Sequence, residues 1–582
     1  MKRWFKYVKP YLPFFILGPL GMIIEVVGEM VMPKLLGFLI DAANENTLTV
    51  PMSISIAGAL IVVVLLMMAG GVAGAYFGAK ASVNFAADLR QDVYGRVQKF
   101  SFANIDKFST GSLVTRMTND VTQLQNFVNM LLRMALRSPG MFIGAIIMAV
   151  ALRPSLSLVF VVTIPLMLIV LGSLISMGFP RFSGMQKKID KLNSTVRENV
   201  TNVRVVKSFV REDYEIEKFQ QDNSDLKEAG MRAVKLAIFM GPVMNIFMYI
   251  TIIAVIWFGH GIVLDEQSIA GGMTVGELSM FITYATQILS SLMMITMLLM
   301  NASRALASGR RICEVLDEVP DIADTSAKYP DLQVQKGSIS FKNVNFRYYK
   351  NNSEWVLQNI NLEIVAGSTV GIIGSTGCGK TSLVSLIPRL YDADEGTVEI
   401  DGINVKDYSL VHLRDGIGMV LQKNLLFSGT ISENLRWGDG EASDEEMIQA
   451  AIHSAADKFI TSFEDGYETA LEKGGANVSG GQKQRLCIAR ALLKKPKILI
   501  LDDSTSAVDT ATEAQIRSAL KNDLADCTKI IIAQRISSVC DADQIIVMDD
   551  GQITGIGTHE ELLEHNQAYT EIYYSQMDKK EA

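Results

Sequence analysis

The chain divides into a strongly apolar first half and a second half that has the pattern of a soluble domain. Four long apolar runs with few charges lie at positions 56–74, 156–177, 238–263 and 281–300. Two less uniform runs lie at 14–39 and 139–152. A run of about 20 apolar residues is long enough to cross a bilayer as a helix. The first half is therefore expected to form about six membrane-spanning helices.

Basic residues predict the orientation of these helices, because Lys and Arg accumulate in cytoplasmic segments. Four of them precede the first span, namely Lys2, Arg3, Lys6 and Lys9. Residues 41–51, which follow that span, contain no Lys or Arg. The N-terminus is therefore expected in the cytoplasm and the protein in the inner (cytoplasmic) membrane. The basic, aromatic start has no small-residue cleavage site, so it is expected to be a retained first span.

The same alternation places two long, charged segments with helical patterning in the cytoplasm, at 80–137 and 180–235. The outer connections, near 153–155 and 265–272, are short. Most of the extramembrane part of the first half is therefore expected on the cytoplasmic side.

From about Val334 onward, short β-branched runs alternate with amphipathic helical stretches. The expected strands lie at 339–346, 368–373, 498–501, 529–533 and 544–548. Strands that alternate with helices indicate an α/β domain with a largely parallel core sheet. The predicted organisation is a membrane domain at 1–315, a linker at 316–333 and a soluble domain at 334–582.

Charge and cysteine content narrow the functional classes. A net charge of -8 does not favour nucleic-acid binding. The five cysteines all lie in the second half, at positions 313, 378, 487, 527 and 540. An odd number in a cytoplasmic segment argues against a disulfide framework, and no Cys/His spacing resembles a metal site.

A glycine-rich loop carries the first candidate chemistry. It follows the strand that ends at Ile373 and opens a helix expected from Thr381 to Leu390. Its residues are Gly374, Ser375, Thr376, Gly377, Cys378, Gly379, Lys380 and Thr381, followed by Ser382. In such a loop, backbone N–H groups enclose phosphates, the lysine reaches the β and γ phosphates, and the threonine hydroxyl can hold Mg²⁺. An ordinary glycine turn is the alternative, which the strand and helix on either side disfavour.

Two further motifs support a nucleotide site. The apolar strand 498–502 ends in Asp502, a carboxylate suited to anchoring Mg²⁺. Upstream of it lies the sequence Val478, Ser479, Gly480, Gly481 and Gln482. With these motifs the chain resembles the ATP-binding cassette (ABC) transporters, whose signature reads LSGGQ. The resemblance covers essentially the whole chain, as a half-transporter of the exporter type. It implies a multidomain membrane protein, with an all-α six-helix transmembrane domain followed by an α/β P-loop NTPase nucleotide-binding domain.

The resemblance also implies roles for single residues, with ATP and Mg²⁺ as cofactors. Tyr348 would stack on adenine, and Gln422 would sense the γ-phosphate and, with Thr381 and Asp502, the metal. The signature residues Ser479, Gly480, Gly481 and Gln482 would contact a nucleotide held by the other subunit. The segment 506–509 would cross to that subunit. Short coupling helices are expected within 106–113 and 208–214, the second of them docking on the partner.

Two departures from the family pattern affect hydrolysis. Asp503 stands where the family has a glutamate that acts as the base, and Gln534 where it has a histidine. Losing one methylene withdraws the carboxylate by roughly 1 Å, which can cost on the order of 100-fold in rate. Glutamine can donate a hydrogen bond, but it cannot carry a positive charge. Together with Gln422, these residues are the predicted catalytic group of a weakly hydrolytic ATPase. Neutral drift is the alternative explanation.

Milder departures are Val478, which replaces the signature leucine, and Lys473, where related exporters often carry an acid. The whole pattern implies a degenerate-site subunit whose partner, a second ABC half-transporter, supplies a glutamate and a histidine. The expected cargo is a small hydrophobic or amphipathic compound of the multidrug type. A lipid or peptide exporter, or a non-transporting ATP-binding regulatory membrane subunit, remains the alternative.

Glu25 and Glu29 lie one helical turn apart in the first span. An acid near the bilayer centre is costly, so it must face a cavity or find a partner. Binding of a cationic cargo and hydrogen bonding between helices in the protonated form are equal alternatives for these residues.

Overall fold

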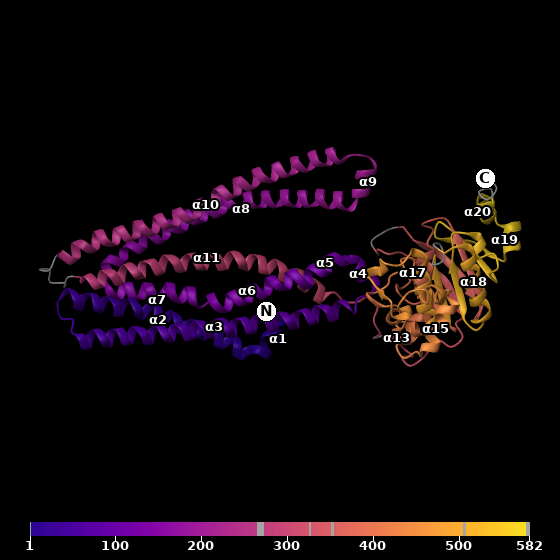
Figure 1. Cartoon of the computed structure of the whole chain (residues 1–582), viewed down its shortest axis with the longest axis horizontal. Coiled ribbons are helices and arrows are strands. Elements are labelled where there is room, and N and C mark those ends of the chain that lie inside the picture. Colours follow the sequence, from indigo (N-terminus) through magenta and orange to yellow (C-terminus); the bar gives the residue numbers. More distant parts are fainter. Residues whose placement is uncertain (1, 265–272, 325–326, 351–353, 504–507, 578–582) are drawn as a thin grey trace. The chain divides into compact units, whose positions relative to one another are not determined.

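The computed structural model describes residues 2–264, 273–324, 327–350, 354–503 and 508–577 (Figure 1). Two compact units make up the chain. The first consists of Met1–Val97 and Gly111–Asp317, and the second of Gln98–Thr110 and Glu318–Ala582. The first unit is all-helical, and the second combines sheets and helices. The second unit therefore contains, besides the end of the chain, a short segment inserted between two helices of the first.

Six helical stretches of the described chain are long and apolar enough to cross a membrane, which confirms the predicted number. They are Arg3–Asn44, Val50–Val97, Thr110–Leu152, Pro154–Thr201, Glu212–His260 and Val275–Asp317. Their elements are α1 (Lys2–Val8), η1 (Lys9–Tyr11), α2 (Leu12–Asn44), α3 (Val50–Val97), α5 (Thr110–Thr115), η2 (Arg116–Asp120), α6 (Val121–Met134), α7 (Arg137–Leu152), α8 (Pro154–Thr201), α9 (Val203–Ser208), α10 (Glu212–Leu264) and α11 (Val275–Asp317). The predicted outer connection at 265–272 lies outside the described residues.

Close backbone contact joins α2 to α3. A side chain at Gly21 would lie only 2.6 Å from the carbonyl oxygen of Gly70 and 2.8 Å from the nitrogen of Gly74. Small residues permit such contacts between apolar helices, where van der Waals packing replaces the hydrophobic drive. Elsewhere in this unit, α8 and α10 run side by side and α9 joins their ends (Figure 1).

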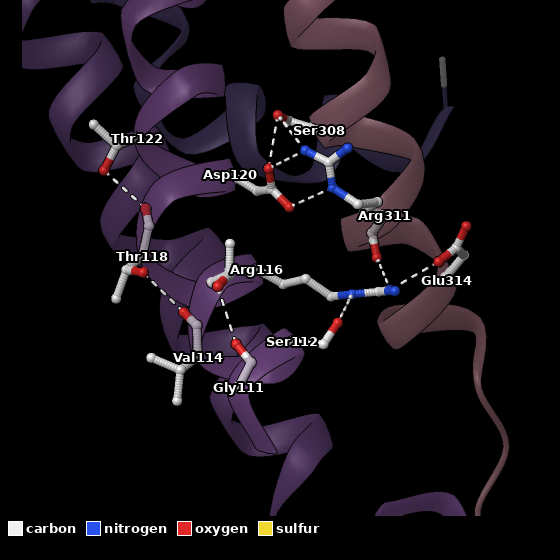
Figure 2. Close-up of polar contacts among 11 residues, drawn as sticks. Gly111, Ser112, Val114, Arg116, Thr118, Asp120, Thr122, Ser308, Arg311 and Glu314 are labelled. Carbon is white, nitrogen blue, oxygen red and sulfur yellow. Dashed lines mark hydrogen bonds and ion pairs between the residues drawn. The ribbon is translucent and has the colours of Figure 1, made fainter. Parts of the chain in front are cut away.

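A buried polar cluster connects the π-helical turn η2 to α11 (Figure 2). Asp120 is 3% exposed and accepts hydrogen bonds from Ser308 Oγ and Arg311 Nε, both at 2.8 Å. Arg311 Nη2 also donates to Asp120. One turn away, Arg116 Nη1 donates to Glu314 at 2.8 Å. These contacts hold the π-helical turn η2 against α11.

The second unit has a parallel core sheet, as predicted, and an additional antiparallel sheet that was not predicted. The core sheet has the strand order β12-β11-β3-β10-β9-β6, and only the edge strand β12 is antiparallel. Its strands are β3 (Thr369–Gly374), β6 (Ile417–Val420), β9 (Ile498–Asp502), β10 (Thr528–Ile532), β11 (Gln544–Asp549) and β12 (Gln552–Gly557). The antiparallel sheet contains β1 (Ile339–Phe346), β2 (Leu357–Ile364), β4 (Glu395–Ile400) and β5 (Ile403–Asn404), and a separate pair consists of β7 (Gly429–Thr430) and β8 (Ala470–Leu471).

The second unit also contains α-helices. They are α4 (Phe102–Phe108), α12 (Lys380–Ser385), α13 (Leu410–Asp415), α14 (Ile431–Leu435), α15 (Asp444–His453), α16 (Asp457–Ile460), α17 (Gly480–Leu493), α18 (Thr510–Asn522), α19 (His559–His565) and α20 (Gln567–Met577). The strands β9 and β10 are buried along their whole length, as expected for central strands of a parallel sheet covered on both faces. The carboxyl ends of β3, β9 and β10 thus lie side by side in a rigid core.

Three helix predictions need correction. The helix expected from Thr381 to Leu390 ends at Ser385. The range 106–113 holds no single short helix. It spans the end of α4, which begins about one turn earlier because Ser101 caps it in a capping box with Asn104, and the start of α5 after Ser109, whose φ is +46°. The short helix expected within 208–214 is α9, which lies before that range and ends at Ser208, two residues before Val210 with a φ of +49°.

Candidate nucleotide-binding site

The glycine-rich loop connects β3 to α12 in a shape that only glycine permits at three positions. Gly374, Gly377 and Gly379 have φ values of +155°, +90° and +96°. A Cβ atom at Gly374 would lie 2.1 Å from the carbonyl oxygen of Met548 on the neighbouring strand. These residues therefore need to be glycines for conformational and steric reasons, and the loop is held against the core sheet.

Lys380 lies over this loop. Its Nζ donates to the carbonyl oxygens of Gly374 at 2.9 Å and Ser375 at 2.7 Å. A second contact joins the loop to β11, since Ser375 Oγ donates to Asp549 at 3.2 Å. The arrangement places a positive charge beside backbone N–H groups and the start of a helix, which is suited to a polyphosphate.

The predicted metal ligands Thr381 and Asp502 are in contact. Thr381 Oγ1 donates to Asp502 Oδ1 at 3.1 Å. Asp502 is 2% exposed, and its Oδ2 atom is buried without a hydrogen-bond partner among the described residues. Burial raises the pKa of Asp502, although the Thr381 hydroxyl counteracts this effect. An orphaned carboxylate oxygen beside a hydroxyl fits Mg²⁺, which binds few protein oxygens and takes its other ligands from water and phosphate.

The two departures from the family pattern are bonded to each other. Gln534 Nε2 donates to Asp503 Oδ2 at 2.8 Å. Asp503 follows β9 and has a φ of +49°, and Gln534 follows β10, so the parallel pairing of these strands brings both to one place. Burial raises the pKa of Asp503, whereas hydrogen bonds with Gln534 and Gln422 lower it. The structure therefore brings all three predicted catalytic residues together.

Tyr348 contacts α12, directly after the glycine-rich loop, through its hydroxyl group. Its OH group lies 2.8 Å from Ser382 Oγ. Its ring is 39% exposed and packs edge-on against Phe346 and Tyr391, with centroid distances of 5.0 and 5.1 Å. A partly exposed aromatic ring beside the phosphate loop is suited to stacking with a base.

The signature residues form a helix start of their own. Ser479 caps α17, since its side chain accepts from the N–H of Gln482, and Gln482 Oε1 accepts from the N–H of Ser479. Val478 is buried and packs into the core of the unit. Among the described contacts, none joins Ser479, Gly480, Gly481 or Gln482 to the glycine-rich loop. Within one chain, the signature is thus a second, separate phosphate-binding candidate.

The crossing segment is only partly described. Ser506 and Ala507 lie outside the described residues. Val508 is buried, and Asp509 caps α18 through hydrogen bonds from the Thr512 backbone and hydroxyl at 3.0 and 2.8 Å.

Tyr391 is a site residue that sequence reasoning missed. Its OH group donates to Asp106 on α4 at 2.9 Å, and its ring contacts Phe102 of the same helix with a centroid distance of 6.0 Å. Since Tyr391 also packs on Tyr348, one ring connects the predicted adenine-binding residue with the short helix α4. No sequence signal marks it, because Tyr391 and Asp106 are separated by 285 positions.

Family models match both halves of the chain. The ABC transporter transmembrane region matches residues 15–292, and the ABC transporter domain matches residues 357–506. An uncharacterized ABC transporter ATP-binding protein of Bacillus subtilis (strain 168), YfiB, is 37% identical over 583 residues, which is 100% of this chain and 99% of that protein.

The chain belongs to the ABC transporter family. A second similar relative is the uncharacterized ABC transporter ATP-binding protein Rv1273c of Mycobacterium tuberculosis (strain ATCC 25618 / H37Rv), 36% identical over 98% of this chain and 97% of that protein. A solved structure, that of a bacterial Atm1-family ABC exporter with ATP bound, matches with a TM-score of 0.77 and 25% identity over 98% of each chain. The protein is therefore an ABC exporter half-transporter, a multi-pass membrane protein with one ATP-binding domain.

Proposed function

We propose that this ABC half-transporter is the degenerate-site subunit of a heterodimeric exporter, which moves small hydrophobic or amphipathic compounds outward across the cytoplasmic membrane. The observation that carries this proposal is the hydrogen bond between Gln534 and Asp503. A water molecule that is to be activated at Asp503 must compete with this amide and with Gln422. The carboxylate is also one methylene shorter than the family's base, which costs on the order of 100-fold in rate when the geometry shifts by about 1 Å.

The binding half of the same site is intact. Lys380, the backbone of its loop and the start of α12 would hold the phosphates of ATP, and Tyr348 would stack on the base. Thr381, Asp502 and Gln422 would hold Mg²⁺, which neutralises charge on the phosphates. The site is thus expected to retain ATP and to hydrolyse it slowly, while the signature from Ser479 to Gln482 completes the faster site of a partner.

Exposed apolar residues support the use of a partner subunit. At the end of α9, Phe209 and Val210 are 73% and 80% exposed, and a groove of ≈ 480 Å³ lies beside Phe209 and Tyr214. An apolar tip of this kind is expected to be covered in the functional assembly. We infer that α9 docks on the nucleotide-binding domain of the partner, with both α4 and α9 in the cytoplasm.

ATPase measurements test this proposal. The purified chain is expected to show little ATPase activity, and coexpression with a partner that carries the family's glutamate and histidine is expected to restore it. In the complex, Ser479→Ala should reduce hydrolysis at the partner's site, and Lys380→Ala should reduce ATP retention at this chain's own site. Rapid turnover by a homodimer of this chain would contradict the heterodimer.

Dye efflux from vesicles separates transport from the alternatives. An exporter of amphipathic compounds should move a hydrophobic dye in an ATP-dependent manner. A regulatory subunit that binds ATP without transport should not. A lipid exporter should instead move a labelled phospholipid between leaflets, and a peptide exporter a labelled peptide.

A further inference from the structure

An ionic cluster lies among three helices of the membrane unit. Glu25 and Glu29 belong to α2, and Arg137 is the first residue of α7. Arg137 Nη2 lies 2.7 Å from Glu29 Oε1 and 3.1 Å from Glu25 Oε1. From α11, Gln287 Nε2 donates to the backbone oxygen of Glu29 at 3.0 Å. The three charged side chains are between 17% and 25% exposed, so the cluster is largely enclosed and still reachable.

The cluster has more acceptors than donors. Two carboxylates share a single nitrogen of one guanidinium, so neither forms the bidentate pair that stabilises such contacts best. Glu29 Oε2 and Gln287 Oε1 are buried and have no hydrogen-bond partner among the described residues. Arg137 Nε is buried without a partner as well. The formal charge of the three ionic groups is -1, and two buried acceptor atoms are without a donor among the described residues.

The remaining charges nearby do not balance this excess within the described residues. Arg133, one turn before Arg137, is exposed, packs its stem near Gly78 of α3 and forms no ion pair within 4.0 Å. Glu25 Oε2 lies beside Gly71 of α3. A Cβ atom added to Gly71 would be 3.3 Å from it. The backbone of α3 therefore contacts the cluster, but it supplies no cation there.

The helix that carries Arg137 is interrupted at this point. Helix α6 ends at Met134 and α7 begins at Arg137, followed by Pro139, which has no N–H to donate to the preceding turn. Arg137 and Glu29 each lie about 22 Å from the ends of their helices at Leu152 and Asn44. This distance is less than the thickness of the hydrocarbon core, about 30 Å, so Arg137 is assigned to the third span and not to the cytoplasmic segment expected at 80–137. At this depth, irregular backbone and buried charge are tolerated only when they line a cavity or a functional site.

We propose that this cluster is a binding site for the positively charged group of the cargo, an organic ammonium carried on an apolar body. The proposal rests on the proposed export function and specifies its substrate class. The ammonium balances the excess carboxylate, and its N–H groups donate to Glu29 Oε2 and Gln287 Oε1. Arg137 holds both glutamates in place but leaves one oxygen of Glu29 unused.

A matched pair of fluorescent probes tests this inference. Dansylcadaverine carries a primary ammonium, and its N-acetyl derivative is neutral but otherwise the same. Binding of both to the full chain in phosphatidylcholine nanodiscs is followed by dansyl fluorescence, with empty nanodiscs subtracted. The ammonium probe is expected to bind roughly tenfold more tightly than the neutral one. In Glu29→Gln the ratio of the two affinities should fall to about one, because the neutral side chain no longer favours the cation.

The control variant is Glu277→Gln, which removes an acid paired with Arg153 at the start of α11, ten residues before Gln287. It should keep the preference for the ammonium probe. Melting temperature and binding of a fluorescent ATP analogue verify that each variant is folded, and Glu25→Gln replaces Glu29→Gln if the latter is not.

Equal affinities of the wild type for both probes would overturn the inference, as would a preference that survives in both glutamate variants. A failure of the proposed export function can be told apart from a failure of this binding site. ATP-driven transport of neutral amphipathic dyes that is unaffected by Glu29→Gln would leave the proposed function standing without this site. Selective binding of the ammonium probe without any transport would support the site and contradict the proposed export function.

Discussion

Two ionic clusters in the membrane unit use the same kinds of side chain and reach opposite outcomes. Around Asp120, one carboxylate receives hydrogen bonds from Ser308 and from two nitrogens of Arg311, and its charge is balanced (Figure 2). Around Glu29, two carboxylates share one nitrogen of Arg137, and a buried oxygen of Glu29 has no partner in the described part of the chain. A saturated cluster can only hold helices together, whereas an unsaturated one can also accept a ligand.

The nucleotide-binding unit repeats this contrast. Asp401 accepts hydrogen bonds from four consecutive backbone N–H groups, at distances between 2.9 and 3.0 Å. Among the described residues, Asp502 accepts a hydrogen bond from the Thr381 hydroxyl, and its buried Oδ2 atom has no partner. Unsaturated carboxylates thus occur at the proposed cargo site and at the proposed Mg²⁺ site, and saturated ones at turns and helix contacts.

The largest effect is expected from breaking the saturated cluster around Asp120. Asp120→Ala removes a buried carboxylate that accepts hydrogen bonds from Ser308 and Arg311, and the loss of these charge-assisted bonds costs about 3 kcal/mol of stability. Glu29→Gln should cost less, about 1 kcal/mol, because Arg137 keeps Glu25 as a partner. Denaturation of both variants in detergent measures the difference. Equal losses would show that the two clusters do not differ in this way.

A large gain is expected from rebuilding the hydrolytic pair. Replacing both residues, Asp503→Glu with Gln534→His, should raise ATP hydrolysis at this chain's site roughly 100-fold, or about 2.7 kcal/mol in barrier. Either change alone should give much less, because the other residue would still be mismatched. Single-turnover hydrolysis in the complex, with the partner's base removed, isolates this site. No increase in the double variant would exclude the pair as the cause of slow turnover.

A smaller effect is expected at Asp401. Burial raises its pKa, but the four backbone N–H groups outweigh this effect and hold the pKa below its usual value. Its contribution, about 2 kcal/mol, is therefore present above the pKa of the unfolded state and is lost as pH falls through the lower folded value. In Asp401→Asn, the amides of residues 335–338 should exchange hydrogen faster at neutral pH. The difference from the wild type should shrink toward pH 3–4.

The smallest effect is expected at the more exposed pair of Tyr391 and Asp106. Tyr391→Phe removes only the hydroxyl, and a partly exposed hydrogen bond contributes about 1 kcal/mol. Combining it with Asp106→Asn in a double-mutant cycle isolates the interaction energy. Tyr391→Phe should keep nucleotide affinity, because the ring still packs on Tyr348. A tenfold loss of ATP affinity would assign the hydroxyl a direct role in nucleotide binding.

Local motifs made the nucleotide site predictable. The run from Gly374 to Thr381 specifies strand, loop and helix by itself, and the spans follow from apolar runs about 20 residues long. The bond between Asp503 and Gln534 follows from a parallel sheet, so their proximity was implied by the strand order but not visible in the chain. Of the antiparallel sheet, the strand at 339–346 was predicted. β2 was missed although it alternates buried and exposed residues, as a half-buried strand does.

Contacts over long sequence distances were not predictable. Arg137 lies 108 positions from Glu29, and nothing in either segment indicates that they pair. The two glutamates alone left ligand binding and hydrogen bonding between helices as equal alternatives. Arg137 and the unpartnered oxygen of Glu29 supply the information that the sequence lacked. The exact limits of α4 and α9 likewise depended on caps and left-handed residues at their ends.

The bond between Asp503 and Gln534 has a consequence for how such half-transporters evolve. Because the two side chains touch, a change in the length of one carboxylate or in the size of its donor alters where the other must lie. Substitutions at these two positions should therefore be inherited as a unit across lineages. Among related genomes, chains with Asp and Gln should be encoded together with chains with Glu and His, and intermediates with one change should be rare.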